Sequence, residues 1–138
     1  MMAAALVVVA AEPCDPWAGR LVDLRVDRSN APLEELRRLL DASDGYDGFG
    51  RAVGALFSGD PAAALASADE GLSALPGEEN LRFVRAGALA ASGDNAGAVG
   101  ELRALIAARP SWATIIRSFA ARGLLTMPPS ALAELLGE

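Results

Sequence analysis

Two stretches of the chain follow one pattern: FSGDPAAALASADEGLSALP at residues 57–76 and ASGDNAGAVGELRALIAARP at residues 91–110. Gly59-Asp60 in the first stretch recurs as Gly93-Asp94 in the second, 34 residues later. At the same spacing Ala64 recurs as Ala98 and Pro76 as Pro110, and Ala68 corresponds to Leu102. A fixed period of this kind indicates a unit of structure that occurs twice.

Each recurring residue suits a place in a pair of antiparallel helices. Gly59 and Gly93 can take the left-handed conformation that ends a first helix, and Asp60 and Asp94 can cap the second helix. Alanine at position 64 is small enough for two helices to cross closely, and the recurring proline stops the second helix. A helix-turn-helix unit of this period is typical of tetratricopeptide-type repeats. The alternative is a chance match, since Gly-Asp is a common turn.

The segment before the first repeat is expected to hold a separate helix, from Pro32 to Asp41. Proline suits a first helical turn, and leucines at 33, 36, 39 and 40 make an apolar stripe. The run from Asp44-Gly45 to Gly48 is expected to end this helix. The first helices of the two repeats follow this break. Five of their side chains should point into the core: Phe49, Val53, Leu56, Phe83 and Leu89.

Two repeats alone would leave an apolar face open at each end. The helix at residues 32–41 should cover one end. A helix that starts at Ser111 and ends at Gly123, followed by a short helix from Ser130 to Leu136, should cover the other. Residues 29–138 are therefore expected to form a tetratricopeptide-like helical domain.

Residues 1–28 are expected to form a β-hairpin. The apolar run from Ala3 to Ala11 has a β-branched centre, which is typical of a strand buried on both faces. Residues 20–27 alternate between apolar and charged side chains, as in a half-buried strand. A strand that is apolar on both faces needs a partner, so we expect a homodimer through this hairpin.

The alternative for residues 1–11 is a secretory signal peptide. Against it, no Lys or Arg precedes the apolar run, so a cytoplasmic location is expected. The run is also too short to span a membrane. The predicted fold class is mainly α: an N-terminal β-hairpin followed by a tetratricopeptide-like array of antiparallel helix pairs.

Composition excludes several kinds of active site. The 138 residues include no histidine, which excludes Ser-His-Asp and Cys-His catalysis and His-ligated metals. The net charge of −6 argues against nucleic-acid binding. Cys14 is expected to be a free structural thiol, because no histidine can act as its base. Asp41, Asp44 and Asp47 lack the later glutamate of a calcium loop and are expected to form a solvated turn, so no metal or cofactor is predicted.

Several segments resemble the C-terminal end of an uncharacterised bacterial family with an Ntn-hydrolase-like fold. Residues 3–9 resemble its penultimate strand, and LVDLRVD at residues 21–27 with PLEELRRLL at residues 32–40 resembles the strand and helix that follow. Residues 80–94 and 110–125 look like a helical extension that some members carry, which is catalogued as a peptidoglycan-binding domain. By that label alone, the resemblance implies peptidoglycan as a partner.

The resemblance also implies a catalytic residue at the start of the full family domain, where a free amine would activate a hydroxyl or thiol. This chain matches only the end of that domain, so no catalytic residue carries over. Residues 1–28 are expected to be a remnant of the hydrolase-like domain. The chain is accordingly interpreted as truncated relative to the family and as non-catalytic.

The remaining candidate site is a groove, because the first helices of tetratricopeptide arrays line a concave surface that holds peptides. In this chain that surface should draw on Tyr46, Phe49, Val53, Phe57, Asn80, Phe83 and Gly87. Arg82 and Arg85 should lie beside it, where they could meet a carboxylate. The alternative is that the aromatic residues belong to the core and that the arginines form a solvated face.

Three functions follow from these observations. The first is a non-catalytic module that binds a peptide or protein through helical repeats. The second is the C-terminal portion of a hydrolase that acts with a separate N-terminal part. The third is a peptidoglycan-binding domain, which depends only on the catalogued name of the extension.

Overall fold

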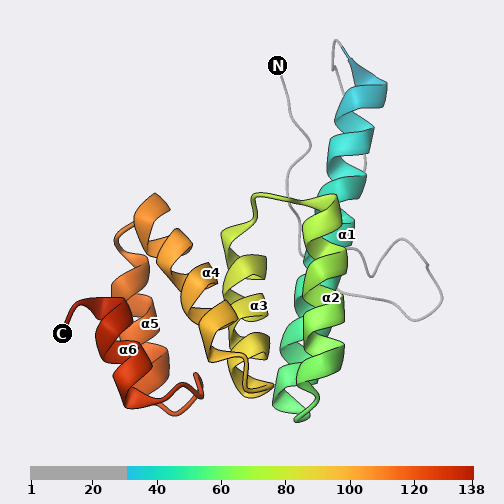
Figure 1. The fold of residues 1–138 in the computed structure, drawn as a ribbon. Helices are drawn as coiled ribbons and strands as arrows, with labels where there is room; N and C mark the ends of the chain where they lie inside the picture. Colours follow the sequence, from blue (N-terminus) through green and yellow to red (C-terminus); the bar gives the residue numbers. More distant parts are fainter. Residues whose placement is uncertain (1–30) are drawn as a thin grey trace.

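The computed structural model describes residues 31–138, which form six helices joined by short turns and loops. In chain order the helices are α1 (Pro32–Phe57), α2 (Pro61–Ala74), α3 (Glu79–Ala91), α4 (Asn95–Ala108), α5 (Trp112–Ala121) and α6 (Pro129–Leu136). Figure 1 shows them arranged along the molecule in this order. The mainly helical class predicted from the sequence is confirmed, whereas the hairpin expected at residues 1–28 lies outside the described residues.

The two Gly-Asp turns have the same geometry. Gly59 and Gly93 both take positive φ angles, 78° and 92°. After each glycine, the aspartate N–H donates to a carbonyl of the helix just ended: Asp60 to Ala55 at 2.9 Å and Asp94 to Leu89 at 2.9 Å. Each aspartate Oδ1 then accepts from the third residue beyond, at 3.0 Å from the N–H of Ala63 and at 2.9 Å from that of Gly97. The repeated pattern therefore marks a repeated helix pair, as predicted.

The helix α1 continues unbroken through the glycines that were expected to end it. That prediction was wrong because those glycines serve a helix crossing. A Cβ atom on Gly48 would lie 2.8 Å from Cα of Gly71 on α2, and one on Gly45 would collide with the Leu75 side chain. Each helical glycine costs about 1 kcal/mol relative to alanine. The contact with α2 outweighs that cost.

Because α1 is one long helix, its first half extends beyond the end of α2 (Figure 1). On this half, Leu39 is buried and Leu36 is half-buried, but Leu33 is 81% exposed. The acidic residues Asp41, Asp44 and Asp47 lie within α1, so the solvated turn expected there is a helix face instead.

The core is built from small residues and leucines on the facing sides of the helices. One cluster joins α1, α2 and α3 around Ala52, Ala68 and Val84, and a larger one joins α3, α4, α5 and α6. Of the residues expected to face inward, Leu89 is buried, whereas Phe49, Val53, Leu56 and Phe83 are half-buried and pack against these clusters. Leu81 of α3 is fully buried and packs against α2 next to Gly71.

The last two helices cover α4, the final helix of the repeats. Trp112 and Ile116 on α5 are buried in the larger cluster, and Leu135 of α6 joins them. The indole Nε1 of Trp112 donates to Glu79 Oε2 at 2.7 Å, which ties α5 to the start of α3. Gly123 has a φ of 72° after the end of α5, as expected, and α6 begins one residue before the predicted Ser130.

We predict opposite effects from two alanine substitutions on α1. Gly48→Ala should lower the free energy of unfolding by about 1–3 kcal/mol, because its methyl group would push against the α2 backbone. Gly50→Ala should raise it by up to about 1 kcal/mol, since nothing lies within 4 Å of the added methyl and alanine favours the helix. Urea titrations followed by circular dichroism measure both. Equal effects would contradict the close crossing.

Candidate binding groove

An apolar groove of about 320 Å³ lies among the first helices of the successive pairs. Its walls come from α1, α3, α5 and the segment that links α5 to α6. The lining residues are Val53, Leu56, Phe57, Phe83, Val84, Gly87, Ala91, Phe119, Gly123, Leu124, Leu125 and Thr126. None of them is charged, and Thr126 supplies the one side chain with a hydroxyl, so the groove is suited to apolar groups.

Large apolar side chains stand exposed at the mouth of this groove. Phe57, the last residue of α1, is 77% exposed, and Leu124 is 51% exposed. Phe119 on α5 is 36% exposed. Burying such side chains against a partner would be favourable by roughly 25 cal/mol per Å² of apolar area. The described part of the chain thus gathers three of its six exposed large apolar residues at one place.

Helical spacing explains how α3 forms the floor. Phe83, Gly87 and Ala91 follow one another at intervals of four residues, so they share one face of the helix. Gly87 and Ala91 carry little or no side chain, which leaves the hollow open. A Cβ atom on Gly87 would meet only Leu56 Cδ1, at an ordinary 3.6 Å. The fold therefore has room for a side chain at position 87 that the sequence leaves unfilled.

Phe83 is held in place by two other aromatic rings. Its ring centroid lies 5.2 Å from that of Trp112 in a stacked arrangement and 5.0 Å from that of Phe119 in an edge-to-face arrangement. Such pairs contribute about 0.5–1.5 kcal/mol each beyond the burial of their area. Phe83 is therefore both a wall of the groove and a structural link between α3 and α5.

The structure brings together four of the residues predicted to form the groove: Val53, Phe57, Phe83 and Gly87. The other predicted residues lie elsewhere. Phe49 packs against the cluster of α1, α2 and α3, and Tyr46 is half-buried one turn earlier on α1. Asn80 is exposed at the start of α3, where its amide donates to Glu78 Oε1 at 3.1 Å.

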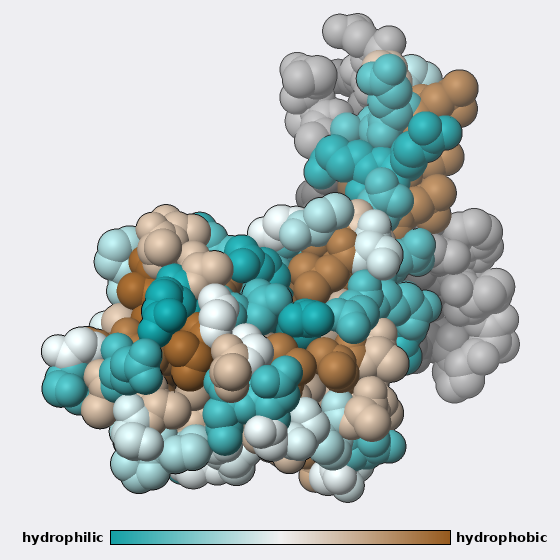
Figure 2. Space-filling model, in the orientation of Figure 1, coloured by the Kyte–Doolittle hydropathy of each residue, from teal (hydrophilic) through white to brown (hydrophobic). Residues whose placement is uncertain are grey.

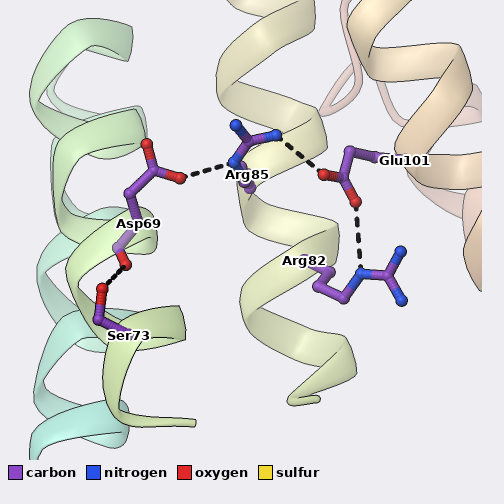
Figure 3. Close-up of polar contacts among 5 residues, drawn as sticks. All are labelled: Asp69, Ser73, Arg82, Arg85 and Glu101. Atoms are coloured by element: carbon purple, nitrogen blue, oxygen red, sulfur yellow. Dashed lines mark hydrogen bonds and ion pairs between the residues drawn. The ribbon is translucent and has the colours of Figure 1, made fainter. Parts of the chain in front are cut away.

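Arg82 and Arg85 do not line the groove: Arg82 points from α3 toward α4, and Arg85 lies between α2 and α4 (Figure 3). Arg85 Nε donates to Asp69 Oδ1 at 2.6 Å, and Arg85 Nη1 donates to Glu101 Oε1 at 2.8 Å. Arg82 Nε donates to the other oxygen of Glu101 at 3.3 Å. The carboxylates that these arginines were expected to meet belong to the chain itself.

This network of Asp69, Arg82, Arg85 and Glu101 joins three helices from two successive pairs. The pKa of Arg85 is raised above its ordinary value, chiefly because its guanidinium donates to Asp69. The side chain of Arg85 is 29% exposed, so water screens its ion pairs only in part. The network holds α3 between α2 and α4, and none of its four residues lines the groove.

Hydrophilic side chains cover much of the face that α2 and α4 present, with smaller hydrophobic patches between them (Figure 2). In residues 31–138, no group of three or more His, Cys, Asp and Glu side chains is placed to hold a metal ion. Among these same residues, no helix has both the length and the apolar character needed to cross a membrane. Cys14 lies outside the described residues.

Asn80 and Arg109 mark a second hollow, which is polar. It lies between the starts of α3 and α5, has a volume of about 360 Å³, and is lined mainly by charged, amide and hydroxyl groups. Glu79 Oε2 already accepts from Trp112 and pairs with Arg109 Nε at 3.4 Å. Glu79 and Arg109 are thus paired with each other, and Glu78 accepts from Asn80, so the apolar groove is the better candidate site.

Comparison with family models, curated proteins and solved structures gave no significant match to this chain.

We predict that two phenylalanines of the groove differ sharply in their effect on stability. Phe83→Ala should lower the free energy of unfolding by about 1–3 kcal/mol, because it removes two ring contacts and the packing of a half-buried side chain. Phe57→Ala should change it by less than about 0.5 kcal/mol, since that side chain is exposed. Thermal and urea unfolding of the two variants measure this. A large loss from Phe57→Ala would show that the residue is part of the core.

The arginine network gives a second stability prediction. Arg85→Ala should lower the free energy of unfolding by about 1 kcal/mol, and the loss should shrink as salt screens the ion pairs in the parent protein. Arg103→Ala is the matched control, because its contact with Glu134 is exposed on both sides and should contribute almost nothing. Equal losses from the two substitutions would contradict a structural role for the network.

Proposed function

We propose that the helical region is a non-catalytic binding module that holds an apolar segment of a protein or peptide in the groove between α1, α3 and α5. The observation that supports this most strongly is the gathering of exposed Phe57, Phe119 and Leu124 around an apolar hollow. Exposed apolar side chains that gather around a hollow are typical of binding grooves. The hollow is at the small end of the range for ligand sites, a size that suits one or two large side chains.

We further propose that the repeat is of the tetratricopeptide type. Two helix pairs at a period of 34 residues support this, as does a groove lined by the first helix of each pair. A partner helix or extended strand could lie along such a surface, with its apolar side chains in the hollow. The resemblance to the Ntn-hydrolase-like family stays a separate prediction, because residues 3–9 and 21–27, on which it depends most, lie outside the described residues.

A substitution that fills the groove with a side chain of the protein itself should weaken peptide binding. Gly87→Leu would place a side chain in the hollow, and its Cβ atom would make only an ordinary 3.6 Å contact with Leu56 Cδ1. Peptides selected from a random phage-displayed library on the immobilised protein should carry large apolar residues. Their affinity for Gly87→Leu should fall at least about tenfold, the equivalent of about 1.4 kcal/mol. Fluorescence anisotropy with labelled peptides measures the affinities.

The matched control is Gly100→Leu, which makes the same change on α4 where nothing lies within 4 Å and no groove residue is nearby in the chain. It should leave peptide affinity unchanged. Circular dichroism should show that both variants keep their helices. If the selected peptides bind Gly87→Leu as tightly as the parent, or if selection enriches no peptide, the proposed function is wrong.

A further inference from the structure

We propose that the segment bound in the groove is basic, with Lys or Arg residues flanking its apolar side chains. This inference rests on the proposed function and names the chemistry of the partner. The groove itself is uncharged and selects for apolar groups. The selection by charge comes from the surroundings of the groove and from the field of the whole molecule.

Residues 31–138 hold few unpaired cations that could receive an acidic partner. The net charge of the chain is −6, and residues 31–138 hold nine arginines against fourteen aspartates and glutamates. Seven of those nine arginines are already paired with carboxylates of the same chain. Within the described part, only Arg37 and Arg122 show no such pair. Arg122 directly precedes the groove residue Gly123 and is the one unpaired cation of residues 31–138 that adjoins the lining in the chain. Apart from Arg122, an acidic segment would meet a negative field.

Two carboxylates lie close in the chain to the groove residues Phe57 and Ala91. Asp60 and Asp94 each follow a groove helix by three residues, after Phe57 and Ala91. Figure 1 shows their two turns and the link between α5 and α6 at the same end of the structure. Each carboxylate is exposed and makes a capping bond through Oδ1. Neither has an ion-pair partner in residues 31–138, so both can attract a Lys or Arg of a bound segment.

Charge also decides against a second copy of the chain as the occupant. Two copies would each bring a net charge of −6 to the contact. They would also bring the same pair of unpaired carboxylates. Repulsion of this kind slows association and weakens the complex, most strongly at low salt. The same negative field attracts a basic segment.

The test uses two versions of one peptide selected on the protein, with identical apolar residues and either Arg or Glu at the flanking positions. The Arg version should bind about tenfold more tightly at roughly 50 mM salt, and the difference should shrink at roughly 500 mM salt. Asp60→Asn with Asp94→Asn should weaken the Arg version about threefold, because asparagine keeps the helix caps but removes the charges. Glu34→Gln, at the far end of α1, is the matched control and should have little effect.

Each remaining outcome contradicts the inference in a distinct way. If the Glu version binds as tightly as the Arg version, or more tightly, the groove still binds an apolar segment, but the inference that this segment is basic is wrong. If neither version binds, the proposed function fails and the inference fails with it. If the protein without peptide sediments as a dimer that Phe57→Ser dissociates, a second copy occupies the groove and the inference is overturned.

Discussion

The close approach of α1 to α2 is the contact on which the other helix positions depend. Gly48 and Gly71 leave no room between the two backbones, since a Cβ on the first would lie 2.8 Å from Cα of the second. Gly71 also faces Leu81, whose Cδ2 would lie 2.8 Å from a Cβ at that position, so α3 sits directly on the crossing. The distance between α1 and α3, and with it the groove between them, follows from this packing.

The second helix pair keeps the turn of the first but not its crossing. The residues 34 positions after Gly48 and Gly71 are Arg82 and Leu105. Leu105 is fully buried, and Arg82 reaches across to Glu101 on α4. Larger residues thus replace the glycine contact, and ion pairs hold α3 against α4 on the face away from the groove. Arg82 and Arg85 contact α2 and α4, and the α3 face that lines the groove therefore consists of Phe83, Gly87 and Ala91, with Val84 beside them.

The sequence was most informative where one residue type had one local role. The recurring glycines and aspartates predicted the turns and the starts of α2 and α4, because a positive φ and a side-chain cap are local requirements. It failed at residues 44–48, where glycine marks a close crossing and not a helix end. It also missed the direction of Arg82 and Arg85, since one residue of helix rotation, about 100°, decides which face a side chain occupies. The partners Asp69 and Glu101 carry no signal in the repeat.

One measurement bears directly on the stacked helix pairs. In NOE spectra of the protein, the Hα protons of Gly48 should show a cross-peak to those of Gly71, because α1 is continuous and touches α2 at that point. Helical amide-to-amide connectivities should run without interruption from residue 44 to residue 49. If the cross-peak is absent and the connectivities break at Gly45 to Gly48, α1 is two helices, and neither the crossing nor the groove beyond it has the form described.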